Sequence, residues 1–286
     1  METRWAYTTS ENFTSLIEES KGVCVIPMGC LEKHGTHLPV GTDIIQASRM
    51  AYLASQIETC CVFPDFTFGN QGSPSNPPQG TVALSAELIS RLLIELCENI
   101  SRCGFKKILI CNGHGGNLAF LDYTIAHRQD RKKADYAVCV FSTPATTAPV
   151  AMAKLLKEKG SGSIPELTPE DEEYILNFYD NNLINGHGGI GETAFIMGTA
   201  PESVRLDRLG AVSGLPLNLS EKYSKAGLRS FGAWGMDIPN WFEGHDPVGV
   251  NERIGKAAIR LESERLAAAI KVLKEDDFWL EFQMNR

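Results

Sequence analysis

Long apolar runs are missing from this sequence. No segment approaches the roughly 18 consecutive apolar residues that a membrane-spanning helix needs, so we expect no insertion into a membrane. A basic excess is missing too, because 27 Lys and Arg residues stand against 35 Asp and Glu residues. The resulting net charge of -8 argues against a nucleic-acid partner.

Paired cysteine motifs and an export signal are also missing. The eight cysteines show no C-x-x-C spacing, and the first residues contain no basic stretch that leads into an apolar run. Several cysteines, such as Cys24 and Cys111, lie inside apolar runs that are typical of buried strands. We therefore expect reduced cysteines and a cytoplasmic location.

What the sequence does contain is an alternation of strand-like and helix-like segments over residues 20–142. Short apolar runs alternate with segments whose apolar residues recur at helical spacing. The predicted strands are 23–28, 61–64, 107–111 and 136–141, and the predicted helices are 44–58, 85–102 and 118–131. Because the strands are apolar throughout, we expect an α/β fold with a mostly parallel sheet that helices cover on both faces.

The predicted helix over 85–102 has clear ends and one apolar face. Ser85 is a favourable N-cap, and Gly104 is a favourable residue just beyond the C-terminus. The apolar stripe consists of Leu88, Leu92, Leu96 and Ile100. We expect this stripe to face the core.

The second half of the chain is less regular. Thr168 precedes a proline and three acidic residues, which is typical of a helix start. Helices are expected over 168–181, 192–199 and 249–275. Residues 209–246 are rich in aromatics and glycine with little periodicity, so we expect them to form excursions over the sheet edge. Without an internal repeat or a linker, residues 1–286 are expected to form a single domain.

Histidine is scarce, with six residues, but three of the six lie in two loops that also contain carboxylates and glycines. The loop from Glu32 to Asp43 contains His34 and His37, and the loop from Asn112 to Asn117 contains His114. Each loop directly follows a predicted strand. Ligands of open α/β sheets bind beyond the carboxyl ends of the strands, so the two loops are expected to converge. Mixed carboxylate and imidazole groups favour a divalent metal, which predicts a metal-dependent hydrolase.

The spacing of these residues favours two ions over one. Glu32 and His34 are separated by Lys33 alone, and we expect their side chains to contact different ions. Two ions that flank the segment can take one side chain each. Asp43 has two oxygens and can bridge both ions, and His114 would complete one ligand set. The other ion needs a further carboxylate, and Glu192 offers one after another glycine-rich turn.

Three motifs resemble the creatininase (creatinine amidohydrolase) family. They are Glu32-x-His34-Gly35-x-His37-Leu38-Pro39-x-Gly41-Thr42-Asp43, Asn112-Gly113-His114-Gly115-Gly116-Asn117 and His187-Gly188-Gly189-x-x-Glu192-Thr193. The resemblance extends from about residue 10 to residue 270, with these three stretches as its sharp parts. It implies a three-layer α/β/α sandwich with a mostly parallel central sheet. It also implies a dinuclear metal amidohydrolase and a homo-oligomer, often a hexamer.

Residue by residue, the resemblance implies two divalent metal ions per chain. The ligands of one ion would be Glu32, Asp43 and His114, and those of the second would be His34, Asp43 and Glu192. His187 matches the family's catalytic histidine, which would donate a proton to the departing nitrogen. Zn²⁺ is expected first, with Mn²⁺ or Fe²⁺ as alternatives. The implied reaction is the attack of a metal-bound hydroxide on the carbonyl of a small amide, cyclic amide or formamide.

The sequence also departs from creatininase itself. Creatininase has a Tyr-Glu pair directly after the histidine that matches His114, with the Glu on metal. This chain has Gly115-Gly116 there, so the metal role would pass to Glu192. Creatininase further has a Trp-Asp pair and a Glu just before its catalytic histidine, and these side chains help to hold creatinine. The residues at those positions here are Leu183, Ile184 and Gly186. Creatinine is therefore not the expected substrate.

Several of these residues also have simpler interpretations. Thr42 or Asp43 would cap a helix that begins near residue 44, and Glu192 would be a first-turn acid on a helix dipole. His37 would either steady a metal ligand or be a buried histidine bonded to the backbone. His187 would be a solvent-exposed histidine in a turn.

Three alternatives to the amidohydrolase remain open. The first is a peptidase-like family member that cleaves a short modified peptide. The second is a non-catalytic module that binds phosphate or a nucleotide with its glycine turns, although the lysine of a P-loop is missing. The third is a structural oligomer with a degenerate metal site.

Overall fold

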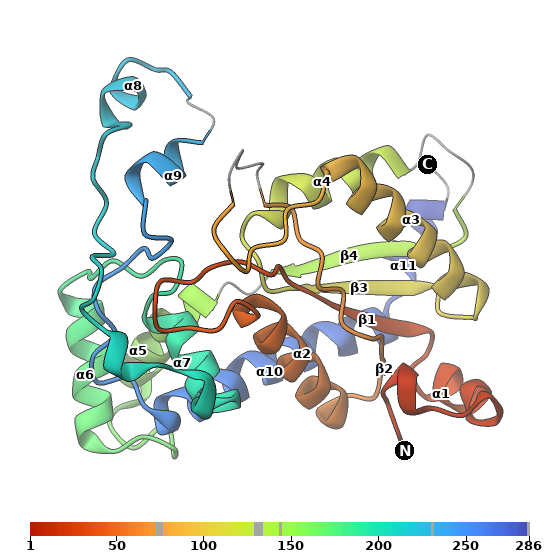
Figure 1. The fold of residues 1–286 in the computed structure, drawn as a ribbon. Coiled ribbons are helices and arrows are strands. Elements are labelled where there is room, and N and C mark those ends of the chain that lie inside the picture. Colours follow the sequence, from red (N-terminus) through yellow and green to blue (C-terminus); the bar gives the residue numbers. More distant parts are fainter. Residues whose placement is uncertain (72–76, 129–133, 143–144, 230–231, 285–286) are drawn as a thin grey trace.

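Parallel strands form the centre of the molecule (Figure 1). The computed structural model describes residues 1–71, 77–128, 134–142, 145–229 and 232–284. Within these ranges one sheet has the strand order β2-β1-β3-β4. Its strands are β1 (Val23–Met28), β2 (Cys61–Val62), β3 (Lys107–Asn112) and β4 (Ala137–Ser142). All neighbouring strands are parallel, which confirms the predicted sheet.

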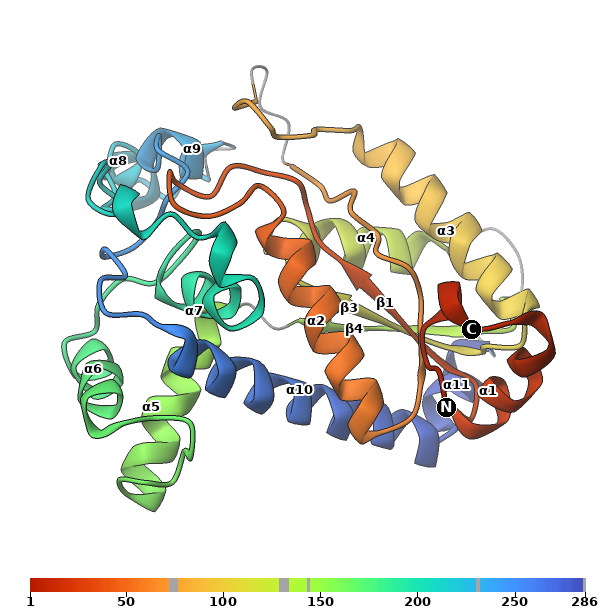
Figure 2. The same ribbon diagram turned by 60° about the horizontal axis from the view of Figure 1, so that its bottom comes forward.

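Each face of the sheet has its own apolar core. Val23 and Val25 of β1 belong to the core that α2 (Thr42–Ile57) and α10 (Glu252–Glu275) cover. Cys24 and Ile26 belong to the core beneath α3 (Ala86–Arg102) and α4 (Asn117–Arg128). Figure 2 shows these helix pairs on opposite sides of the strands. The predicted three-layer α/β/α arrangement is therefore confirmed.

The buried face of α3 differs from the predicted stripe. The side chains that reach the core are Ile89, Leu93, Cys97 and Ile100. Leu88 and Leu92 are 52% and 43% exposed, so the expected stripe was wrong by one residue at these positions. The helix carries two neighbouring apolar rows, and periodicity alone does not decide which row meets the sheet. The N-cap prediction is confirmed, because the Ser85 side chain accepts a hydrogen bond from the backbone N–H of Leu88.

The second half of the chain adds helices beyond the carboxyl ends of the strands (Figure 1). They are α5 (Ala148–Lys159), α6 (Pro169–Asp180) and α7 (Ile190–Thr199). Helix α5 was not predicted, and α7 begins two residues earlier than predicted. Gly198 of α7 and Gly255 of α10 let these helices touch, because a Cβ at Gly198 would lie 2.4 Å from the carbonyl carbon of Gly255.

The remaining described helices are short. They are α1 (Phe13–Glu19), α8 (Glu221–Lys225), α9 (Ala233–Asp237), α11 (Phe278–Met284) and the 3₁₀ turns Trp5–Tyr7, Ser10–Asn12, Ala145–Thr147, Pro201–Ser203 and Leu206–Arg208. Helices α8 and α9 lie in the irregular segment predicted over 209–246, which projects at the upper left of Figure 1. The end of the predicted helix 118–131 and part of the loop 67–80 lie outside the described residues. No helix in the described ranges is both long and apolar enough to cross a membrane.

Asp171 connects α6 to α10. It forms a capping box with Thr168, and its carboxylate accepts hydrogen bonds from Arg253 Nε at 2.7 Å and from Asn251 Nδ2 at 2.7 Å. Burial alone would raise the pKa of Asp171, but the Arg253 guanidinium and the backbone N–H of Thr168 outweigh it and lower the pKa. The folded state therefore favours the charged carboxylate.

Replacing Asp171 with asparagine is expected to lower the free energy of unfolding by about 1–2 kcal/mol at pH 7. Because the folded pKa lies below that of the unfolded chain, this contribution is present above about pH 3.9 and is lost as the pH falls through the folded pKa. Urea denaturation at pH 7 and pH 3 would measure it, with the exposed Glu173→Gln variant as control. An equal difference between wild type and variant at both pH values would contradict the prediction.

Candidate metal centre

The first turn of α2 packs directly against the chain just beyond the ends of β1 and β3. Gly29 directly follows β1, and Gly113 directly follows β3. A Cβ at Gly29 would lie 2.5 Å from the backbone nitrogen of Ile44, and one at Gly113 would lie 2.3 Å from the carbonyl oxygen of Asp43. Both strand ends therefore need glycine so that the helix can approach. This close approach positions Asp43 between the loops.

Alanine at residue 113 is expected to destabilise the fold by about 3 kcal/mol, because its side chain would overlap the backbone of α2. Gly115 offers a matched control two residues away. A Cβ at Gly115 would meet no atom within 4 Å, so Gly115→Ala should change the free energy of unfolding by less than about 0.5 kcal/mol. Chemical denaturation of both variants measures the difference. Equal free energies of unfolding for the two variants would show that the contact between Gly113 and the backbone of α2 is not tight.

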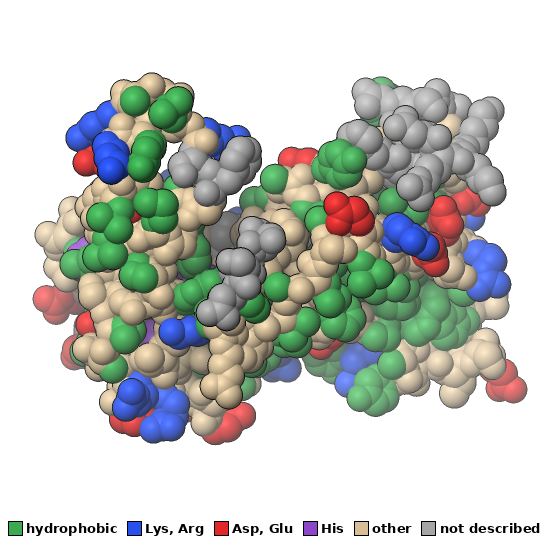
Figure 3. Space-filling model, turned by 45° about the horizontal axis from the view of Figure 1, so that its top comes forward, with side chains coloured by type: hydrophobic (Ala, Val, Ile, Leu, Met, Phe, Trp, Pro, Cys, Tyr) green, Lys and Arg blue, Asp and Glu red, His purple; other side chains and the backbone are tan. Residues whose placement is uncertain are grey.

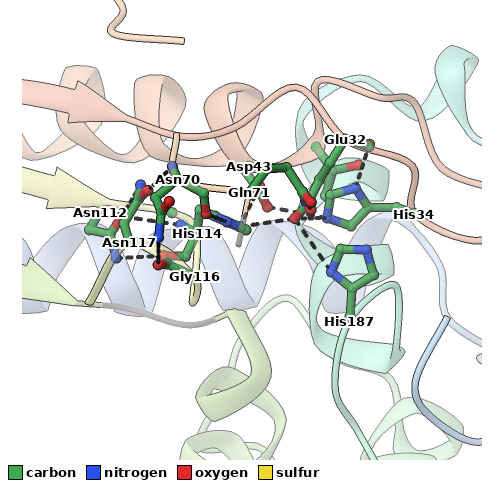
Figure 4. A network of polar contacts seen from close by, with 12 residues as sticks. Glu32, His34, Asp43, Asn70, Gln71, Asn112, His114, Gly116, Asn117 and His187 are labelled. Atoms are coloured by element: carbon green, nitrogen blue, oxygen red, sulfur yellow. Dashed lines mark hydrogen bonds and ion pairs between the residues drawn. The ribbon is translucent and has the colours of Figure 1, made fainter. Parts of the chain in front are cut away.

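The five predicted metal ligands are all buried and lie together in one cluster. Figure 4 shows four of them, Glu32, His34, Asp43 and His114. His34 Nε2 lies 3.2 Å from Asp43 Oδ1 and 3.4 Å from Glu192 Oε2. On the other side, His114 Nδ1 lies 2.9 Å from Glu32 Oε1 and 3.1 Å from Asp43 Oδ2. The two oxygens of Asp43 thus face two different histidines. Asp43 therefore lies between His34 with Glu192 and His114 with Glu32.

Backbone carbonyls fix which nitrogen of each histidine carries a proton. His34 Nδ1 lies 3.0 Å from the carbonyl oxygen of Glu32, and His114 Nε2 lies 3.1 Å from that of Asn70. A carbonyl can only accept, so these two nitrogens donate. In the neutral rings the other nitrogens then carry lone pairs that face carboxylate oxygens. Opposed lone pairs are favourable only when a second proton or a metal cation lies between them.

Two buried carboxylate oxygens support a cation at this position. Glu32 Oε1 and Asp43 Oδ2 accept no hydrogen bond from the described residues. Both oxygens face His114 Nδ1, which has no proton to donate in the neutral ring. Burying a charged oxygen without a hydrogen-bond donor is costly, and native structures normally satisfy such groups. The donor set of two imidazoles and three carboxylates suits Zn²⁺, Mn²⁺ or Fe²⁺. The residues present therefore fit divalent metal.

The charges in the cluster depend strongly on one another. Burial alone would lower the pKa of His34, but Asp43 and Glu192 outweigh it and raise this pKa to about 10. For the Glu192 carboxyl the effect of burial is dominant, and it raises the pKa to about 7. Burial would raise the pKa of Asp43 as well, but His34 and His114 lower it below its usual range. Cations that bind here would replace ring protons, so metal affinity should increase with pH.

His187 lies against this cluster rather than in solvent, so its interpretation as an exposed histidine was wrong. Its side chain is 13% exposed, and its ring stacks on that of His34 with the centroids 4.0 Å apart. Nε2 donates to the carbonyl oxygen of Lys33 at 2.7 Å, and Nδ1 lies 3.6 Å from Glu32 Oε1. Burial and the neighbouring His34 lower the pKa of His187 to about 3. The resting ring is therefore neutral, with the Nδ1 lone pair directed into the cluster.

The capping interpretation of Thr42 and Asp43 was also wrong. Helix α2 begins at Thr42, and its N-cap is Gly41, without a side-chain cap. The hydroxyl of Thr42 donates to the carbonyl oxygen of Pro39 at 2.7 Å. Asp43 is therefore inside the first turn, where its carboxylate is directed at the histidines instead of at the helix end.

The simpler interpretations of Glu192 and His37 are compatible with the site. Glu192 is in the first turn of α7, and its Oε2 accepts a hydrogen bond from the backbone N–H of Gly188 at 2.6 Å. The same oxygen faces His34. His37 is buried, and its Nε2 lies 3.0 Å from the carbonyl oxygen of Gly188 and 3.1 Å from Thr193 Oγ1. His37 thus holds the turn that positions Glu192.

Some neighbours of the cluster were not singled out from the sequence. Cys30 offers a sulfur within 4.8 Å of ligand atoms of Glu32 and His114, and the Gln71 side-chain amide donates to Glu32 Oε2. Cys30 precedes Glu32 by two residues, so strand alternation was a usable signal for it. Gln71 belongs to a Pro- and Asn-rich loop and gave no signal.

A family model described as creatininase, creatinine amidohydrolase, matches residues 6–270. The chain belongs to the creatininase family. A mycofactocin precursor peptide peptidase of Mycolicibacterium smegmatis is 29% identical over 139 residues, which cover 46% of this chain and 54% of that protein. The chain thus spans about half the length of the mycofactocin peptidases that it matches. As a member of this family, the chain contains residue groups that can hold a metal.

Two further comparisons cover a larger share of this chain. A creatinine amidohydrolase of Pseudomonas putida is 22% identical over 209 residues, 70% of this chain and 73% of that protein. A solved structure of a mutant creatininase of Zn-Zn type matches with a TM-score of 0.69 at 18% identity. That match covers 95% of this chain and 98% of the other, so the two chains share their fold.

Proposed function

We propose that this protein is a dinuclear metal-dependent amidohydrolase that cleaves a C–N bond of a small amide, cyclic amide or formamide. One observation carries the proposal: the two oxygens of Asp43 face different histidines, each beside a further carboxylate. A shared carboxylate of this kind would suit a site that holds two divalent ions. The Zn-Zn type of the matched creatininase supports the same reading.

The chain's own residues divide the work of the reaction. Two bound ions would supply a water molecule of lowered pKa and positive charge for the carbonyl oxygen. One ion would be held by Glu32, Asp43 and His114, and the other by His34, Asp43 and Glu192. His187 is neutral at rest, so it can accept a proton from the attacking water at Nδ1 and deliver it to the departing nitrogen. Its stacking on His34 and its hydrogen bond to Lys33 hold the ring in place.

Creatinine remains an unexpected substrate. A Cβ at Gly186, where creatininase has a glutamate, would lie 2.6 Å from Glu243 Oε2. No larger side chain fits there without movement of Glu243. This wall of the site is therefore built from different residues than in creatininase, which supports a different small amide.

The runner-up is a peptidase that cleaves a short modified peptide, and the named mycofactocin peptidases favour it. A panel of small amides, formamides, cyclic amides and short peptides, assayed with protein loaded with Zn²⁺, Mn²⁺ or Fe²⁺, tests both. Turnover of small amides supports the proposal, and turnover of peptides alone supports the peptidase. Metal binding without any turnover would favour a structural oligomer. Absence of metal, with protection by phosphate against thermal unfolding, would favour the phosphate-binding module.

Assembly and location are part of the same proposal. We propose a homo-oligomer, a hexamer by resemblance to the family, and light scattering of the purified protein would measure its mass. A cytoplasmic location fits the eight cysteines, because no disulfide joins them in the part of the chain that the structure describes.

A further inference from the structure

Two tryptophans lie beside His187, and one of them is hydrogen-bonded to a carboxylate. The ring of Trp234 lies 5.2 Å from that of His187, and the ring of Trp241 lies 6.3 Å from it. The two indoles meet edge to face with centroids 5.6 Å apart. Glu243 Oε2 accepts a hydrogen bond from Trp234 Nε1 at 2.9 Å. We call Trp234, Trp241 and Glu243 the tryptophan wall.

Backbone hydrogen bonds attach this wall to the loops of the metal centre. Gly35 donates to the carbonyl oxygen of Trp241 at 2.5 Å, and Gly186 donates to that of Glu243 at 2.7 Å. The backbone N–H of Glu243 in turn donates to the carbonyl oxygen of His187 at 2.6 Å. Trp241 has a φ of 55°, a conformation that a bulky residue adopts only where its surroundings enforce it. The wall therefore has a fixed position relative to His187.

The wall is accessible from outside. The Trp234 side chain is 38% exposed on α9, although it touches a mostly buried histidine. Figure 3 shows a recess between the projecting segment that contains α8 and α9, at the upper left, and the rest of the molecule. Trp234 is thus in contact with solvent and with His187 at the same time.

The charge of Glu243 is not balanced by the described part of the chain. Its carboxylate receives one hydrogen bond in the described ranges, from the neutral Trp234 indole. No ion pair within 4.0 Å joins it to a described Lys, Arg or His side chain, whereas Glu221 on α8 pairs with Lys225. A half-buried carboxylate beside an indole attracts a positive charge, and indole faces attract cations as well.

We propose that the tryptophan wall binds a positively charged nitrogen group of the substrate, an ammonium or a guanidinium. His187 delivers its proton to the departing nitrogen, so a group that touches the wall lies on the amine side of the scissile bond. The substrate is then an amide whose departing amine carries a second, cationic nitrogen. This inference rests on the proposed amidohydrolase for the position of the scissile bond and on the wall alone for the charge.

Two probes of nearly equal size test the charge preference. N-(2-aminoethyl)acetamide carries an ammonium on the amine side, and N-(2-hydroxyethyl)acetamide carries a neutral hydroxyl in its place. Calorimetric titration of the metal-loaded protein should show at least about tenfold tighter binding of the ammonium probe. Glu243→Gln should reduce this preference about tenfold. Trp234→Leu should weaken the binding of the ammonium probe more than the binding of the hydroxyl probe. Glu221→Gln, a variant of the same projecting segment, should keep the wild-type preference.

Binding and turnover separate this inference from the proposed function. Equal binding of the two probes by the wild type, or an unchanged preference in Glu243→Gln, would overturn the role of the wall even if amides are hydrolysed. A preference that depends on Glu243 without hydrolysis of any amide would support the wall and overturn the amidohydrolase. Circular dichroism of each variant checks that the fold is intact, and Trp234→Leu provides the second test if Glu243→Gln fails to fold.

Discussion

Replacing Asp43 with alanine is expected to remove both metal ions and to lower turnover at least a hundredfold. Each oxygen of this carboxylate faces a different histidine, so no other described side chain contributes to both sets of ligands in the same way. Loss of a residue beyond the direct ligands already costs about 10–100-fold in such sites, and loss of a shared ligand should cost more. Elemental analysis of the purified protein measures the change, with about two equivalents expected in the wild type.

Two further variants make the Asp43 result interpretable. Asp180→Ala removes an exposed carboxylate that pairs with Lys157 and should keep the full metal content. Asp43→Asn keeps the side-chain volume and should still lose most of the metal, which separates lost ligation from lost packing. Retention of one full equivalent in Asp43→Ala, in a protein that remains folded, would refute the bridging role.

Replacing His187 with alanine is expected to lower kcat by about 10²–10⁴-fold while the metal content stays unchanged. The ring touches the cluster without belonging to either ligand set, and its neutral state lets it accept a proton before it donates one. Added imidazole should restore part of the activity, because the variant leaves a ring-sized space beside His34. Steady-state kinetics with a turned-over amide, with and without imidazole, measures both effects.

His245→Gln is a suitable control for the His187 variant. His245 lies near the same turn and accepts a hydrogen bond from the backbone N–H of Ile184, away from the cluster. Its replacement should leave kcat within a few-fold of the wild type. Wild-type turnover in His187→Ala would rule out a catalytic role, and a loss of metal in that variant would make His187 a structural support instead.

Patterns within single segments predicted the fold well. Residues 108–111 of the strand β3 form an unbroken apolar run, and their burial on both faces follows from that run. The N-cap of α3 was predicted from Ser85, because a cap is a local hydrogen bond. The buried face of α3 was not, since Leu88 and Ile89 lie on adjacent apolar rows and contacts with other segments chose between them. The helix α5 was missed altogether.

The candidate site, too, was predictable from the sequence only in part. Two loops that follow parallel strands must leave the same sheet edge, so the approach of Glu32, Asp43 and His114 was predictable from topology. Glu192 and His187 come from a distant segment, and only the family resemblance assigned them roles. The contacts of Asn70, Gln71 and the tryptophan wall join segments that are far apart in the sequence. Periodicity and spacing contain no information on such contacts.

The sequence by itself determined the parallel sheet, the placement of the two motif loops at its carboxyl edge and the kinds of side chain that can bind metal. These features depend on residue type and on short spacings, which act locally. Only the tertiary structure decided that each oxygen of Asp43 faces a different imidazole, that His187 is neutral, and that tryptophans from a remote segment lie beside it. Those features arise from packing between distant segments, where burial and neighbouring charges set both the orientation and the protonation of each group.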